Sequence, residues 1–111
     1  MTELEPRARL QLLIAMAGDC AAPEADRHEA AARAAGLSGA EIDAARARRS
    51  FDARVNAAIA LACAVRHGAD WREAEARCAQ AGFDAGARAL IIGLGKLSAE
   101  QVRAMLGGIT Q

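Results

Sequence analysis

The segment DCAAPEADRHEAAARAAGL, which runs from Asp19 to Leu37, decides how this chain can fold. Its alanine-rich middle lies between Pro23, which suits a first helical turn, and Gly36, which suits the position just after a helix. At about 3.6 residues per turn, the residues that share a face with His28 are Glu24, Ala25, Ala31, Ala32 and Ala35. Because alanine lets another backbone approach closely, this face can form the wall of a narrow pocket.

Helix signals recur along the rest of the chain and predict one all-helical domain over residues 1–111. Alanine, the best helix former, accounts for 31 residues, whereas the chain has two Phe, one Trp and no Tyr. Capping boxes at Ser38 and Ser98, and glycines after apolar runs, mark where helices begin and end. The expected helices, about six to seven in one bundle, cover roughly 6–17, 23–35, 38–48, 51–67, 70–82, a stretch around 90–94, and 98–107.

The helix expected over about 51–67 is apolar nearly all round between Ala57 and Val65, so we expect it at the centre of the bundle. Gly93 and Gly95 each weaken the next-to-last helix by about 1 kcal/mol relative to alanine, so that helix can break there. Small side chains also give a thin core, and we therefore expect the chain to gain stability by forming a homo-oligomer.

Composition also narrows the class of protein. Fourteen basic and fourteen acidic residues balance, so we expect no nucleic-acid partner. The longest apolar run, residues 57–65, is far shorter than the roughly 20 residues needed to cross a bilayer, and the first residues lack a basic leader, so we expect a cytoplasmic protein without a membrane partner. Cys20, Cys63 and Cys78 are odd in number and lack CxxC spacing, so we expect no disulfide framework, metal or cofactor.

His28 and Cys20 are the first candidates for chemistry. An imidazole has an ordinary pKa near 6.5, and Glu24, one turn earlier, can hold the ring and raise its pKa. An ordinary helical Glu–His pair explains the same spacing. A thiol near a helix N-terminus, such as Cys20, can be a nucleophile, although it can equally be a small buried hydrophobe. We interpret Cys63 and Cys78 as packing residues, and His67 as the end of a helix.

A local basic cluster adds a candidate binding surface. A solvated helix end explains such a cluster, since cations are favoured near helix C-termini, and contact with an anion or a substrate carboxylate is the alternative. The members of this cluster are Arg46, Arg48, Arg49 and Arg54.

The ordered set of motifs resembles the carboxymuconolactone decarboxylase and alkylhydroperoxidase D-like family over roughly residues 7–97. An apolar helix and a Cys-bearing connector precede His28, which lies in the spacing His-x7-Gly-Leu-Ser and is followed by Glu41-Ile42. Asp-Ala-Arg-x-x-Ala-Ala over residues 52–58 and Ala-Gly-Phe-Asp over residues 81–84 complete the set. The resemblance implies an all-α bundle that forms homo-oligomers, with the His28 helix lining a pocket near a subunit interface.

The resemblance also implies two kinds of chemistry. In the peroxidase branch a CxxCxxxH motif carries the redox cycle, and here its histidine falls on His28, its second cysteine on Glu24 and its first on Ala21, next to Cys20. Since the cysteine pair is missing, only a single-cysteine antioxidant acting on a peroxide remains open. The decarboxylase branch implies acid–base work on a carboxylate, with His28 and Glu24 as general acid and base. Arg27 or Arg54 would then bind the substrate carboxylate.

Two functions therefore remain open. The chain can be a small enzyme of this family that uses Cys20, Glu24 and His28. It can instead be a catalytically inactive member that acts as an oligomeric binding or structural module. The missing cysteine pair favours the inactive module, whereas a histidine centred on an alanine face favours the enzyme.

Overall fold

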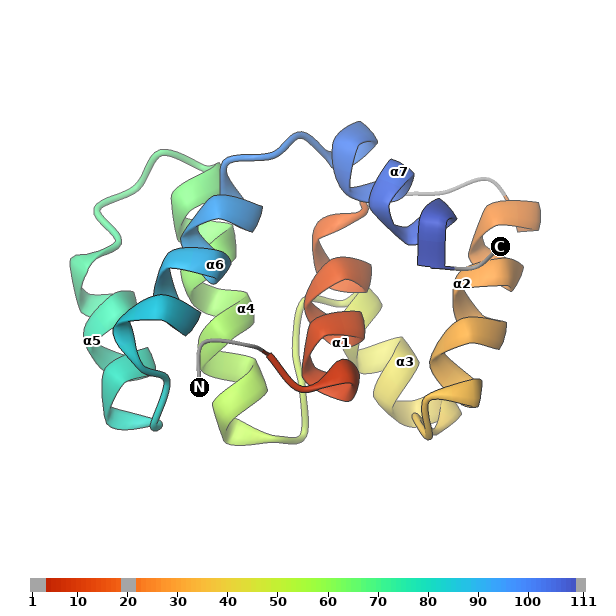
Figure 1. Cartoon of the computed structure of the whole chain (residues 1–111), viewed down its shortest axis with the longest axis horizontal. Coiled ribbons are helices and arrows are strands. Elements are labelled where there is room, and N and C mark those ends of the chain that lie inside the picture. Colours follow the sequence, from red (N-terminus) through yellow and green to blue (C-terminus); the bar gives the residue numbers. More distant parts are fainter. Residues whose placement is uncertain (1–3, 19–21, 110–111) are drawn as a thin grey trace.

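The computed structural model describes residues 4–18 and 22–109, apart from the side chains of Ala22 and Ile109. This part of the chain is all-helical, as the composition predicted, with seven helices and no strand. The helices are α1 (Pro6–Met16), α2 (Ala22–Ala34), α3 (Gly39–Arg46), α4 (Ala53–Arg66), α5 (Arg72–Gln80), α6 (Ala85–Gly95) and α7 (Ala99–Ile109) (Figure 1). None of these helices has the length and apolar character of a bilayer-spanning segment.

The first helix, α1, is the centre of the bundle. Eight consecutive residues from Leu10 to Ala17 are buried. α1 packs against α2, α3, α4, α6 and α7, and Figure 1 shows it between the α4–α6 group and the α2–α7 group. The sequence-based expectation that the helix over 51–67 is central is wrong, because α4 packs mainly against α1, α5 and α6, whereas α1 packs against helices on both of its sides. The large side chains of α1 fill the space between helices better than the alanines of α4 can.

α4 and α6 approach each other closely at Gly95. A Cβ atom on Gly95 would lie 2.6 Å from the carbonyl oxygen of Ala62 and 2.8 Å from Cβ of Val65. At Gly93 a Cβ atom would meet nothing within 4 Å. α6 continues through Gly93 without a break and ends at Gly95.

Helix ends follow local sequence signals closely. The capping box at Ser38 is present, with Ser38 Oγ accepting from the Glu41 backbone N–H at 3.1 Å and Glu41 Oε1 accepting from the Ser38 N–H at 3.0 Å. Four glycines that follow helices have positive φ, as a left-handed helix stop requires. α3 ends two residues earlier than predicted because Arg48 has φ +62°.

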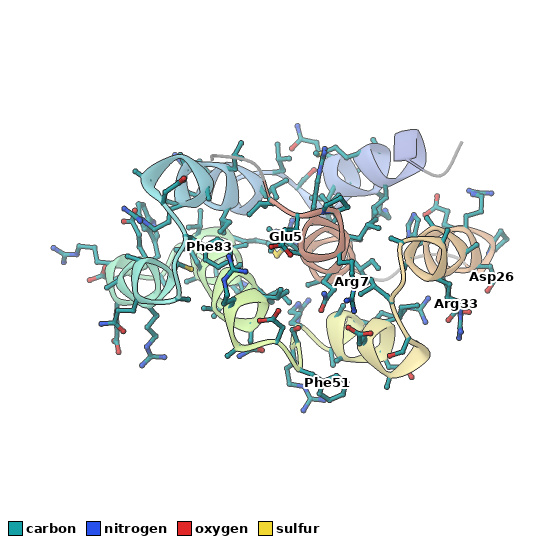
Figure 2. The ribbon with its side chains drawn as sticks, turned by 60° about the horizontal axis from the view of Figure 1, so that its bottom comes forward. Glu5, Arg7, Asp26, Arg33, Phe51 and Phe83 are labelled. Atoms are coloured by element: carbon teal, nitrogen blue, oxygen red, sulfur yellow. The ribbon has the colours of Figure 1, made fainter. Side chains whose placement is uncertain are left out.

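The orientation of α2 agrees with the predicted helical face. His28 is 7% exposed and Ala32 is fully buried, so this face of α2 lies against the rest of the bundle. Asp26 is exposed and points away from the bundle (Figure 2), and Arg33 on the same side of α2 is exposed as well. α2 packs against α1, α3 and α7, which places His28 beside the C-terminal end of α1.

Candidate functional site

An open cleft of about 710 Å³ lies at the C-terminal end of α1. The end of α1 supplies an apolar wall, α2 supplies His28, and the end of α3 supplies two arginines. The lining residues are Ile14, Ala15, Ala17, Gly18, Ala25, His28, Arg46 and Arg48. Among the described residues, the ionisable side chains that line the cleft are His28, Arg46 and Arg48, each of which can carry positive charge, so this part of the cleft suits an anion with an apolar body.

The electrostatic surroundings of His28 favour its neutral form. Burial lowers the pKa of His28, and the charges of Arg27, Arg46 and Arg103 lower it further, while Glu24 acts in the opposite direction. Glu24 raises the pKa of His28 as expected, but burial and the arginines outweigh this one carboxylate, so the net shift is downward. A neutral imidazole at neutral pH can accept a proton, which is the property of a general base.

Arg46 and Arg48 both line the cleft but differ in how they are held. Arg46 Nη2 donates to the carbonyl oxygen of Ala25 at 3.2 Å, and Arg46 Nη1 lies 3.8 Å from Glu29 Oε1. These contacts tie the end of α3 to α2. Within residues 4–18 and 22–109, the guanidinium of Arg48 makes neither a hydrogen bond nor an ion pair. Arg48 therefore keeps all its donors available to a ligand.

Two further arginines hold the wall of the cleft in place. Arg66 Nη1 donates to the carbonyl oxygen of Met16 at 2.6 Å, and Arg103 Nη1 donates to that of Ala17 at 2.8 Å. Arg66 Nη2 also donates to the carbonyl oxygen of Leu97 at 2.9 Å. These cations satisfy carbonyls at the C-terminus of α1, where the helix dipole favours positive charge.

The structure brings some of the predicted site residues together. Glu24 lies on α2 one turn before His28 and is half-buried, and the exposed Arg27 is the next residue before His28. Both act on the pKa of His28. Cys20 lies outside the described residues.

Arg54 lies in a different pocket, of about 150 Å³, at the N-terminal end of α1. Its Nε donates to the carbonyl oxygen of Ala81 at 3.1 Å, and its guanidinium carbon lies 4.8 Å from the centre of the Phe83 ring. Glu5, Arg7 and Phe83 line this pocket (Figure 2). The structure therefore does not bring Arg54 to His28.

The two described cysteines have the surroundings of packing residues. Cys63 is half-buried, with its Sγ 3.8 Å from Met16 Sδ, and the buried Cys78 Sγ donates to the carbonyl oxygen of Ala57 at 3.3 Å. Burial raises the pKa of both thiols, which favours the protonated and less nucleophilic form of each. Among the described residues, no group of three or more His, Cys, Asp or Glu side chains could hold a metal ion.

The sequence did not single out Arg46 and Arg48 as partners of His28. Both were placed in a basic cluster with Arg49 and Arg54, and that cluster divides over three different hollows of the molecule. No sequence signal separates Arg48 from the others. Its place directly after α3, where glycine follows four other helices, is known only from its φ.

Comparison of the chain with protein-family models, with curated proteins and with solved structures found no match. The family resemblance therefore depends on the ordered motifs around His28, and the description of the site depends on its geometry.

Proposed function

We propose that the chain is a divergent member of the carboxymuconolactone decarboxylase and alkylhydroperoxidase D-like family that performs acid–base chemistry on a small organic acid. The observation that carries this proposal is a buried imidazole whose pKa is lowered, in a cleft whose other ionisable groups, among the residues that the structure describes, are Arg46 and Arg48. No oxidant or metal is needed for such chemistry.

In the proposed reaction His28 acts as the general base. The substrate carboxylate binds to arginine at the mouth of the cleft, and its apolar part lies against Ala15 and Ala17 of α1. His28 accepts a proton from a carbon next to a carbonyl group, and Glu24 stabilises the resulting imidazolium. The same imidazolium then returns the proton to the product, so the protein ends the cycle unchanged.

Hydrogen exchange tests this proposal directly. In deuterated buffer the wild-type chain should speed the loss of the C–H signal next to the carbonyl of lactone carboxylates, as followed by proton NMR. His28→Gln should remove this activity, whereas His67→Gln, at the exposed end of α4, should retain it. If hydrogen exchange is no faster with wild type than with His28→Gln, His28 is not the general base.

A second candidate is a single-cysteine antioxidant. Gly18 lines the His28 cleft and Cys20 follows it by two residues in the sequence, which favours this alternative. The Cys20 thiolate would attack a peroxide, giving an alcohol or water and a sulfenic acid, and an external low-molecular-weight thiol would reduce the sulfenic acid. Peroxide consumption that persists in Cys20→Ser would exclude it.

We also propose that the chain forms a homo-oligomer, in the enzyme or in a catalytically inactive binding or structural module. Phe51 is 75% exposed beside a hollow of about 560 Å³ that is lined by Ala44, Asp43 and Arg49. One surface thus holds an exposed ring, a recess and both charge signs, which suits the self-complementary patch of a twofold contact between copies. Sedimentation should show an oligomer that Phe51→Glu converts to monomer, with unchanged helix content by circular dichroism.

A further inference from the structure

One helix stop in this molecule differs from the others in its residue type. Five described residues have positive φ, and four of them are glycines that follow α1, α2, α4 and α5. The fifth is Arg48, with φ +62°, after α3. A side chain in the left-handed region crowds the next carbonyl oxygen, which glycine avoids.

The hydrogen bonds show that these positions are equivalent. After α3 the Arg49 N–H bonds to the Ala44 carbonyl at 2.8 Å and the Arg48 N–H to the Ala45 carbonyl at 2.9 Å. This six-to-one and five-to-two pair defines a Schellman motif. The same pair of bonds closes α2, α4 and α5, with glycine where α3 has Arg48. Glycine would therefore fit the backbone of α3 at least as well.

No hydrogen bond or ion pair among the described residues offsets the backbone strain at Arg48. Its side chain lines the His28 cleft. Its charge lowers the pKa of Arg66, so the two guanidinium groups repel each other. A strained backbone that holds an unpaired cation at the edge of a cleft indicates a role outside stability.

We propose that Arg48 is the anion-binding residue of the cleft and that it binds the carboxylate of an organic acid with an apolar body. This inference rests on the proposed use of the cleft but not on any reaction there. Arg46 donates to the Ala25 carbonyl and pairs with Glu29, so it supplies mainly charge. Arg48 supplies the free planar donors that bind a carboxylate through two hydrogen bonds.

Arg48→Gly distinguishes a role in stability from a role in binding, because it should raise the stability of the fold and lower its affinity for a carboxylate. The melting temperature should rise by roughly 2–5 °C, since the left-handed residue is no longer strained. Affinity for benzoate, measured by chemical-shift titration of the full chain, should fall roughly 10- to 100-fold. Benzamide, which has the same shape but no charge, should bind weakly to both chains.

Two variants serve as controls. Arg9→Gln removes the same charge from an exposed position near the other end of α1, outside the cleft, and should leave benzoate affinity within about twofold of wild type. Arg48→Lys keeps the charge and the strained backbone but loses the planar donors. It should bind benzoate with intermediate affinity and have the same melting temperature as wild type.

Three binding results would overturn the inference. Wild type could bind benzoate no better than benzamide, Arg48→Gly could bind benzoate as tightly as wild type, or Arg9→Gln could lose as much affinity as Arg48→Gly. A lower melting temperature for Arg48→Gly would also overturn it. Failure of the acid–base proposal looks different. Benzoate would then bind through Arg48 while His28→Gln leaves hydrogen exchange unchanged.

Discussion

Replacing Gly95 with alanine should destabilise the fold, even though alanine is the better helix former. The new Cβ would lie 2.6 Å from the Ala62 carbonyl oxygen and 2.8 Å from Val65 Cβ, both well inside van der Waals contact. The obstacle is backbone, so α4 and α6 must separate. Overpacking of this kind costs about 1–3 kcal/mol, against a gain of at most about 1 kcal/mol from helix propensity.

Gly93→Ala is the matched control, because it makes the same change in the same helix with open space around the new methyl group. This variant should gain about 0.5–1 kcal/mol. The two variants should therefore differ by about 2 kcal/mol in the free energy of unfolding. Urea unfolding followed by circular dichroism measures this difference, provided that the slope m is the same for both.

Equal stability of the two alanine variants would refute the reasoning. It would mean that α4 and α6 can move apart at no cost, and that Gly95 is not needed for their close approach. A Gly95→Ala variant more stable than wild type would be a stronger contradiction, since only helix propensity would then act.

Three other predictions concern His28 and the helix caps. Because the folded state lowers the pKa of His28, the unfolded chain binds more protons, so stability should fall as pH drops below about 6.5, and His28→Gln should flatten that part of the urea-unfolding profile. Glu24→Gln should lower the NMR-titrated pKa of His28 further, and an unchanged value would show that Glu24 has no influence. Ser38→Ala should cost about 1 kcal/mol of unfolding free energy, and a loss below about 0.3 kcal/mol would argue against the capping box.

Local signals made most of the helices predictable from the sequence. Ser38 and Ser98 begin helices and Gly36, Gly68 and Gly82 end them, because caps depend on residues only a few positions apart. The inward face of α2 followed from helical periodicity alone. The central helix could not be predicted in the same way. Apolar character identified α4, whereas side-chain volume and contacts far along the chain place α1 at the centre.

The geometry of the candidate site was predictable only where a single helix carries it. The burial of His28 could be predicted because its neighbours on the helical face are close in sequence. Arg48 was missed because a left-handed φ at an arginine cannot be read from its neighbours. Arg54 was assigned to substrate binding, but its contacts with Ala81 and Phe83 arise from packing between α4 and the α5–α6 loop.

The central position of α1 also has a consequence for biosynthesis. The ribosome makes α1 before any of the helices that cover its apolar residues 10–17. Arg103, whose guanidinium binds the Ala17 carbonyl, is added 86 residues later. Until α4 and α7 have emerged, this apolar surface is exposed to water or bound by a chaperone. The nascent chain is therefore prone to aggregate during most of its translation.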